Sequence, residues 1–319
     1  MTSKSEIEPG KLELKKAYDR VKPYVHRTPI LTSKNLNRIS DSNLFFKCEN
    51  FQKVGAFKFR GACNAIYSME PSALVNGVAT HSSGNHAQAL ALAAAMKEVP
   101  AYIVMPRTAP VVKKDAVRGY GAEIIECEPT LQARKNMLAE VLAKTGAEYV
   151  PPYNDYRIIC GQATAAIELI EEKDDLDAII TPVGGGGLLA GASLATMYFS
   201  PTTKVYAGEP EGADDAFRSF HKGEIVPNES VNTIADGLLT NLGDKNFGII
   251  KKGVEGIFTV SDEEIVSAMK LIWERMKIVV EPSGAVPFAA LLKNKEVFHG
   301  KKVGVILSGG NVDLSKLPF

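Results

Sequence analysis

Four successive glycines, Gly184 to Gly187, are the residues of this chain whose spacing first suggests chemistry. They follow the apolar segment 178–183 and open the apolar segment 187–198. Because consecutive glycines lose much backbone entropy on ordering, a loop without a ligand seldom uses them. The amides of such a loop, at a helix start, can hold a phosphate; a flexible turn is the alternative. Since Leu188 follows directly and no Lys-Ser/Thr follows, neither a dinucleotide fingerprint nor a P-loop is matched.

Two further polar turns follow apolar segments in the same way. The first comprises Ser82, Ser83, Gly84, Asn85 and His86, and the second comprises Ser308, Gly309, Gly310 and Asn311. In an open parallel sheet, ligands bind outside the carboxyl ends of the strands. We therefore expect a ligand to meet these turns.

Lys58 stands between two aromatic residues, Phe57 and Phe59, at the start of an expected helix. A desolvated lysine has a lowered pKa and can act as an amine nucleophile. Taken alone, such a lysine is more often a solvated helix residue. Beside a loop suited to phosphate, it favours a covalent bond with pyridoxal phosphate.

The elements that must position these residues alternate between short apolar runs and helical periodicity. We expect strands at 44–47, 78–82, 101–105, 123–127, 178–183, 204–208 and 303–307. We expect helices at 58–69, 86–97, 109–119, 131–145, 161–172, 187–198, 262–276 and 284–293. Ser261 should cap the helix at 262–276, because acidic residues fill its first turn. Alternation of this kind predicts doubly wound parallel sheets.

Composition excludes several classes of protein. The 319 residues are 45% hydrophobic and 23% charged, which is typical of a globular chain. A net charge of zero gives no electrostatic reason to expect nucleic acid as a partner. No apolar run approaches the ~20 residues of a membrane span, and the polar N-terminus lacks a secretory core, so a cytoplasmic location is expected. The four cysteines are expected to be reduced and structural: Cys48, Cys63, Cys127 and Cys160.

Seven segments together resemble the fold-type II pyridoxal-phosphate enzymes of the serine racemase and serine/threonine dehydratase group. They are FQKVGAFKFRGA (51–62), THSSGNHAQA (80–89), PVGGGGLLAG (182–191), GEPEGADD (208–215), TIADG (233–237), ERMKIVVEPSGA (274–285) and LSGGNVD (307–313). They lie in the family's order over nearly the whole chain. The sulfhydrylase and β-synthase relatives carry different contexts around the lysine, so this branch is preferred.

The resemblance implies a role for each residue of the expected site. Lys58 would bind the cofactor covalently and serve as base on one face of the substrate Cα, and Ser83 would be the acid/base on the other face. The other cofactor contacts would be Phe57 and Gly237 on the ring faces, Asn85 at the ring hydroxyl, Ser308 at the pyridine nitrogen, and Gly184, Gly185, Gly186 and Gly187 at the phosphate. The substrate carboxylate would meet Ser82, Ser83, Gly84, Asn85 and His86, with Arg134 closing over it. His86 is expected to be a structural residue more than a base.

A metal site is implied by the same resemblance. Glu209, the carbonyl of Ala213 and Asp215 would bind Mg²⁺, Ca²⁺ or Mn²⁺ and order the loop around them. From spacing alone, an acidic turn in solvent would be the better interpretation.

Regulation by nucleotide stays open. Some racemases of this group bind ATP between subunits, and Lys53, Gln88, Lys113 and Tyr120 fall in matching segments. Tyr153, however, stands where the ATP-responsive animal enzymes carry Asn, so ATP as an activator is unresolved. The chain ends at Phe319, so we expect no C-terminal regulatory domain.

The resemblance implies two α/β domains of the tryptophan synthase β type in a homodimer. Residues 1–77 and 153–319 would form the large domain, and 78–152 a small mobile domain inserted in it. The implied activity is racemisation of serine together with its dehydration to pyruvate and ammonia. The alternative is dehydration of threonine or threo-3-hydroxyaspartate with minor racemisation. A non-catalytic module that binds an amino acid or phosphate is the rival from another class.

Overall fold

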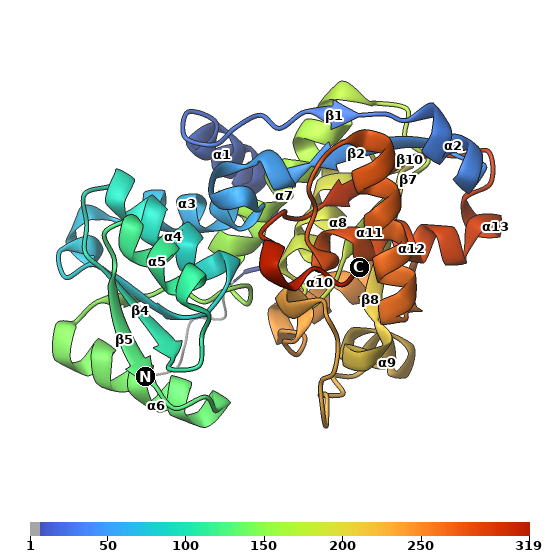
Figure 1. Cartoon of the computed structure of the whole chain (residues 1–319). Helices are drawn as coiled ribbons and strands as arrows, with labels where there is room; N and C mark the ends of the chain where they lie inside the picture. The colour runs from blue at the N-terminus through green and yellow to red at the C-terminus, as the bar shows by residue number, and fades with distance from the viewer. Residues whose placement is uncertain (1–6) are drawn as a thin grey trace.

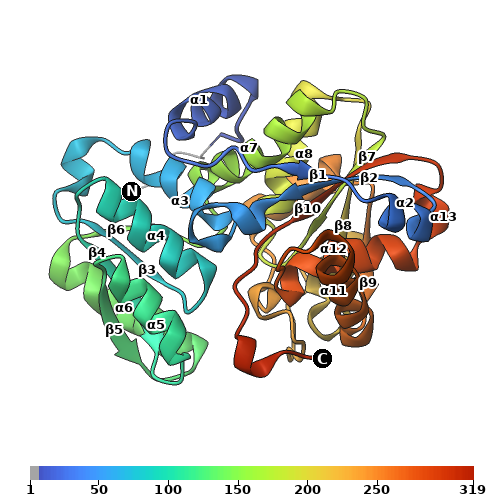
Figure 2. The same ribbon diagram turned by 45° about the horizontal axis from the view of Figure 1, so that its top comes forward.

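The computed structural model describes residues 7–319 and forms two lobes, each built on one sheet with helices on both faces (Figures 1 and 2). Residues 1–6, the first part of the polar N-terminal stretch, lie outside the described residues. Among the residues described, no helix is both long and apolar enough to cross a membrane.

The larger sheet has six strands in the order β1-β2-β10-β7-β8-β9. They are β1 Ile30–Leu31, β2 Asn43–Cys48, β7 Ala178–Pro182, β8 Lys204–Pro210, β9 Gly256–Val260 and β10 Lys302–Leu307. Only the β1–β2 pair is antiparallel. Because β10 and β7 are neighbours, the turn at Ser308 and the glycine loop leave the same edge of the sheet.

The smaller sheet has four strands in the order β5-β4-β3-β6, and all its pairs are parallel. They are β3 Val78–His81, β4 Ala101–Pro106, β5 Glu123–Cys127 and β6 Glu148–Tyr149. These strands form one uninterrupted stretch of the chain, whereas strands of the larger sheet precede and follow it.

Helices cover both faces of each sheet (Figure 2). They are α1 Lys11–Val21, α2 Lys34–Ser40, α3 Lys58–Tyr67, α4 Asn85–Met96, α5 Val111–Gly119, α6 Leu131–Thr145, α7 Tyr156–Glu172, α8 Gly187–Phe199, α9 Asp215–Lys222, α10 Asp244–Gly253, α11 Asp262–Met276, α12 Pro282–Lys293 and α13 Lys295–Phe298. One core of the larger sheet contains residues of α1, α7, α8 and α10, and the other contains residues of α2, α11 and α12.

The core beside the smaller sheet includes buried residues of α3 as well as of α4. Phe59, Ala62 and Ile66 of α3 join Ala87 and Leu90 of α4 in this cluster. Helix α3 therefore packs with the smaller sheet, although it precedes residue 78 in the sequence.

The predicted helices and strands are confirmed, but some predicted helices begin at other residues than expected. All seven predicted strands and all eight predicted helices are present. Helix α7 begins at Tyr156 and not at residue 161, because the side chain of Asp155 accepts a hydrogen bond from the Arg157 amide and caps it. Helix α12 begins at Pro282 instead of residue 284. The unpredicted elements include β1, β6, β9, α1, α2, α9 and α10.

Two finer predictions are also confirmed. Ser261 caps α11 in a reciprocal capping box with Glu264. All four cysteines are unpaired and buried.

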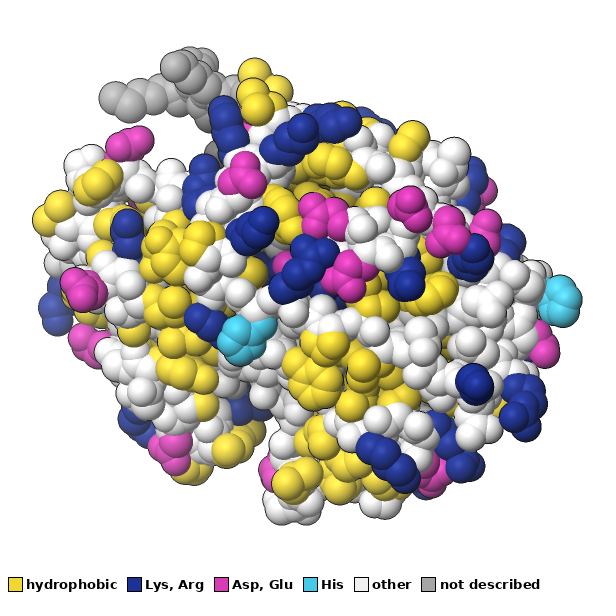
Figure 3. All heavy atoms as spheres, turned by 90° about the horizontal axis from the view of Figure 1, so that it is seen from above, with side chains coloured by type: hydrophobic (Ala, Val, Ile, Leu, Met, Phe, Trp, Pro, Cys, Tyr) yellow, Lys and Arg dark blue, Asp and Glu magenta, His cyan; other side chains and the backbone are white. Residues whose placement is uncertain are grey.

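The surface in Figure 3 carries both basic and acidic side chains, as expected for a chain with 37 residues of each charge.

Candidate active site

Lys58 is positioned by a short backbone pairing between the chain before α3 and the chain after β10. The Phe57 amide donates to the Ser308 carbonyl at 3.0 Å, and the Gly310 amide donates to the Gly55 carbonyl at 2.9 Å. Gly55 has a φ of +67°, and a Cβ there would lie 2.7 Å from the side-chain oxygen of Asn311. This pairing fixes the first residue of α3, which is Lys58.

The Lys58 side chain is half-buried, and its amine reaches the chain that follows β6. Its Nζ donates to the Pro152 carbonyl at 2.9 Å and lies 5.2 Å from the centre of the Phe57 ring. Burial lowers the pKa of Lys58 to about 8, while the carboxylate of Glu281 acts in the opposite direction. A larger neutral fraction at physiological pH makes this amine a better nucleophile.

The tetraglycine loop links β7 to the N-terminus of α8. Gly186 has a φ of +91° and is the N-cap residue of α8. A Cβ at Gly184 would lie 2.9 Å from the Leu238 backbone, and one at Gly185 would overlap the Tyr153 ring. Among the described residues, no hydrogen bond is donated by the amides of Gly184 to Gly187. Such free amides at a helix start suit a phosphate.

A polar cluster joins the two lobes beside this loop. The Asn85 side-chain amide donates to both carboxylate oxygens of Glu281, at 2.9 and 3.2 Å. The Asn311 side chain donates to Asn85 Oδ1 at 2.9 Å, and the Asn311 amide donates to Glu281 at 3.0 Å. Burial, together with Asp236, raises the pKa of Glu281 to about 8.

The turn from Ser82 to His86 lies at the N-terminus of α4; His86 is buried, and the four residues before it are half-buried. His86 Nε2 lies 3.2 Å from the Val150 carbonyl, and burial together with the charge of Lys58 lowers its pKa to about 3. A histidine kept neutral in this way suits the structural role favoured from the sequence. Ser83 lies two residues before Asn85, whose side chain reaches the cluster described above.

The other three predicted contact residues, Ser308, Gly237 and Arg134, lie in different parts of the structure. Ser308 is buried at the end of β10, and the Gly237 amide donates to Ser283 Oγ at 3.0 Å. Arg134 lies in α6 of the smaller lobe; burial, and after it the positive charge of Arg134, lowers the pKa of His81 at the end of β3. The Nε of Arg134 is buried without a hydrogen-bond partner.

The predicted metal ligands lie along one stretch of the chain: Glu209 belongs to β8, Ala213 ends the short helix after it, and Asp215 opens α9. Glu209 accepts from the amides of Ala216 and Phe217 at 3.0 and 2.7 Å, and Asp215 accepts from Asn228 Nδ2 and the Leu242 amide at 2.7 and 2.6 Å. Burial raises the pKa of both carboxyl groups, and the charge of Asp215 raises the pKa of Glu209 further. Within residues 7–319, no group of three or more His, Cys, Asp or Glu side chains is arranged around a metal position. Two carboxylates with a carbonyl and waters still form a donor set that suits a hard divalent cation.

Three residues of the site were not singled out from the sequence: Glu281, Asn246 and Pro152. Glu281 lies inside one of the resemblance segments, which could have drawn attention to it. Asn246 donates to the Gly185 carbonyl at 2.5 Å from α10, a helix that was not predicted although acidic and basic residues mark its two ends. Asn311 was expected in the turn after β10, whereas Tyr153 was considered only for nucleotide regulation.

The residues present fit pyridoxal phosphate. The amides of the glycine loop have no hydrogen-bond partner, and Gly184 and Gly185 have no room for a Cβ atom. Both properties suit a loop whose backbone binds a phosphate. Lys58 supplies a buried amine of lowered pKa for an aldehyde.

Comparisons with known proteins agree with this assignment. Residues 21–309 match the family model described as "Pyridoxal-phosphate dependent enzyme". The chain is 54% identical to a beta-hydroxyaspartate dehydratase from Paracoccus denitrificans, over 95% of this chain and 96% of that relative. It is 48% identical to a serine racemase from Dictyostelium discoideum, over 96% of this chain and 95% of that relative.

Solved structures show the same fold. The crystal structure of the Dictyostelium discoideum serine racemase superposes with a TM-score of 0.92 at 48% identity, covering 96% of this chain and 99% of that one. The maize serine racemase gives a TM-score of 0.95 at 43% identity, covering 97% and 95%. The chain therefore belongs to the pyridoxal-phosphate-dependent enzyme family.

Proposed function

We propose that this enzyme racemises serine and also removes water from serine to give pyruvate and ammonia. The observation that supports the proposal is that the Lys58 amine, whose charge acts on His86 of the Ser82–His86 turn, donates to the Pro152 carbonyl, next to Tyr153, whose ring borders the glycine loop. The serine racemases among its relatives support the same substrate.

Pyridoxal phosphate, when bound, supplies an aldehyde carbon for the amines and a ring that withdraws electrons from the substrate Cα. The amides of Gly184 to Gly187 would hold its phosphate, Asn85 would bond to its ring hydroxyl, and Ser308 would bond to its ring nitrogen. Phe57 and Gly237 would contact the two faces of its ring. A hydroxyl at Ser308 does not force the nitrogen to be protonated as a carboxylate would, which suits loss of a β-hydroxyl more than a long-lived carbanion.

Two residues move the proton at Cα. Lys58 removes it from one face of L-serine, and Ser83 returns a proton to the other face, which gives D-serine. Loss of the β-hydroxyl after the first proton transfer leads to pyruvate and ammonia instead. The amides of the turn from Ser82 to His86 bind the substrate carboxylate at the start of α4.

Dehydration of threo-3-hydroxyaspartate is the second candidate activity. The buried Nε of Arg134 has no hydrogen-bond partner, and an arginine can bind a second carboxylate through two parallel hydrogen bonds. Two relatives, a beta-hydroxyaspartate dehydratase and an L-threo-3-hydroxyaspartate ammonia-lyase, support this candidate.

A substrate panel separates the two candidates. The enzyme is given both serine enantiomers, threonine and threo-3-hydroxyaspartate, and the products are measured by chiral chromatography and keto-acid detection. Racemisation of serine supports the first proposal. A kcat/KM that is highest for hydroxyaspartate, lost on Arg134→Met, with no D-serine formed, would support the second and contradict the first.

The variant Ser83→Ala tests the two-face mechanism. It should abolish interconversion of L- and D-serine and leave part of the elimination from L-serine, since Lys58 still reaches its own face. Unchanged racemisation would show that another group acts on the second face.

We further propose that Glu209, the Ala213 carbonyl and Asp215 bind a divalent cation that orders the loop at 208–216. Mg²⁺, Ca²⁺ or Mn²⁺ should then raise the melting temperature of chelator-treated enzyme. Asp215→Asn should abolish this response, whereas the matched control Asp214→Asn, whose side chain pairs with Arg218, should retain it. Identical responses in the two variants would exclude the site.

The division into a large domain of residues 1–77 and 153–319 and a small mobile domain of 78–152, the homodimer and the cytoplasmic location also stay predictions. Closure of the small domain would exclude water from the site. Sedimentation of the holoenzyme measures the oligomeric state.

A further inference from the structure

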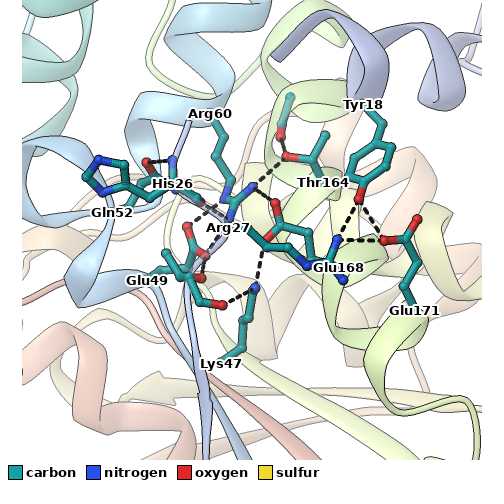
Figure 4. A network of polar contacts seen from close by, with 12 residues as sticks. Tyr18, His26, Arg27, Lys47, Glu49, Gln52, Arg60, Thr164, Glu168 and Glu171 are labelled. Atoms are coloured by element: carbon teal, nitrogen blue, oxygen red, sulfur yellow. Dashed lines mark hydrogen bonds and ion pairs between the residues drawn. The ribbon is translucent and has the colours of Figure 1, made fainter. Parts of the chain in front are cut away.

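A fully buried ion cluster lies two residues after Lys58, centred on Arg60 (Figure 4). The Arg60 guanidinium donates to both oxygens of Glu49 at 2.7 and 2.8 Å, and to both oxygens of Glu168 at 2.8 Å. The side chain of Arg60 has no exposed surface. An arginine that forms two bidentate pairs is held in one orientation.

The cluster is completed by Lys47, which balances its charge. Lys47 Nζ donates to Glu168 at 2.6 Å and to the Thr28 carbonyl at 2.7 Å, and Thr28 Oγ1 donates to Glu49 at 2.6 Å. Two cations thus face two carboxylates. Lys47 belongs to β2, Glu49 follows β2 directly, and Glu168 belongs to α7. Every charged partner of Arg60 therefore lies beside the larger sheet.

The same turn of α3 also abuts the backbone of α7. A Cβ at Gly161 would lie 2.5 Å from the Arg60 carbonyl oxygen and 2.6 Å from the Gly61 Cα. The opposite side of α3 packs in the core of the smaller sheet through Phe59, Ala62 and Ile66. Helix α3 therefore lies between the lobes, and its first turn is bonded to the larger one.

We propose that Arg60 is a positioning residue for Lys58, because its ion cluster fixes the first turn of α3 to β2 and α7. This inference rests on the proposed function. The cluster keeps the Lys58 amine in place against the larger sheet and the glycine loop while the smaller lobe, which packs on the other side of α3, moves. Arg60 touches neither substrate nor cofactor and acts through the backbone of its own helix.

The conservative variant Arg60→Lys tests this role. It retains the positive charge but loses both bidentate pairs. We expect kcat to fall by about 10- to 100-fold with a much smaller change in KM, since a reacting group displaced by about 1 Å costs this much. The fraction of chains that carry pyridoxal phosphate on Lys58 after borohydride reduction, measured by mass spectrometry, should fall as well.

Gly161→Ala is an independent second variant, because it displaces the same turn and leaves every charge in place. It should lower kcat and the covalent fraction in the same direction, and it decides the question if Arg60→Lys does not fold. Arg27→Met is the matched control. It also removes two arginine–carboxylate pairs from α7, with Glu171 and Glu172, but at the exposed end of the helix. It should leave kcat and the covalent fraction at the wild-type level.

The outcomes separate this inference from the proposed function. Folded variants with a lower melting temperature but a wild-type kcat and covalent fraction would reduce Arg60 to a stabilising residue and overturn its positioning role alone. A wild-type chain that never carries the cofactor on Lys58 would overturn the proposed function and this inference together.

Discussion

Lys58 gains its reactivity from burial, which holds its pKa near 8 where an ordinary lysine has 10.5. Only the neutral amine attacks an aldehyde. The shift also has a consequence for stability. Between about pH 8 and 10.5 the folded chain binds fewer protons at Lys58 than the unfolded chain, so the stability of the cofactor-free chain should rise with pH over this window.

The pKa of Lys58 can be measured through the rate of cofactor attachment. In the cofactor-free chain, the rate of covalent attachment of pyridoxal phosphate should increase from pH 7 to 9 and level off above pH 9, as expected for a pKa of about 8. Stopped-flow absorbance follows the reaction, and Lys58→Ala should show no attachment at any pH. A rate that continues to rise through pH 10.5 would contradict the lowered pKa.

Gly185 gives a second prediction at the residue scale. In Gly185→Ala the new methyl group overlaps the Tyr153 ring, so the loop must shift and its amides lose their arrangement. The Kd for pyridoxal phosphate should rise by about tenfold or more, which corresponds to about 1.4 kcal/mol or more. Gly248→Ala in α10 is the control, because nothing lies within 4 Å of its Cβ. An equal Kd in the two variants would contradict the claim that a methyl group at position 185 disturbs the phosphate-binding loop.

The sequence allowed the residues with unusual chemistry to be identified, and missed those whose role depends on the fold. Lys58 and the four glycines stand out by residue type and spacing. Glu281 is an ordinary charged residue, and only folding brings its carboxylate to Asn85, about 200 positions away in the sequence.

At the scale of elements, α11 shows how local sequence specifies a helix start. Ser261 Oγ accepts from the Glu264 amide at 3.3 Å, and the Glu264 side chain accepts from the Ser261 amide at 2.8 Å. The motif satisfies two amides that the helix itself cannot pair, so it could be predicted without knowledge of the rest of the fold.

Ser261→Ala should therefore lower the free energy of unfolding by about 1 kcal/mol, without changing cofactor binding. Urea unfolding followed by circular dichroism measures the loss. Ser267→Ala is the control on the same helix, because its hydroxyl only donates to the Glu263 carbonyl at an exposed position. A loss in Ser267→Ala as large as in Ser261→Ala would show that the cap contributes nothing specific.

Other elements could not be predicted because their sequences carry too little periodicity. Strands β1 and β6 have two residues each, so alternation cannot be recognised in them. The first turn of α7 was missed because Asp155 and Tyr156 read as part of the polar turn before it, and the capping bond of Asp155 becomes visible only in the structure.

At the scale of the molecule, the two lobes are joined by the packing of α3 and by polar contacts around the site. Asn85 reaches Glu281, Lys58 reaches the Pro152 carbonyl, and Lys113 of α5 forms an ion pair of 2.5 Å with Asp236. The strands of the smaller sheet form one stretch of the chain, with strands of the larger sheet before and after it. The strand order could not be predicted, because which strands become neighbours depends on tertiary packing.

The most direct test of the whole account is the site of covalent attachment. The chain is incubated with pyridoxal phosphate, reduced with borohydride, digested and examined by peptide mass spectrometry. One reduced cofactor per chain is expected, attached to Lys58 and absent from Lys58→Ala. A wild-type chain that carries no covalent cofactor, or carries it on another lysine, would contradict the assignment of Lys58 and would favour a module that only binds its ligand.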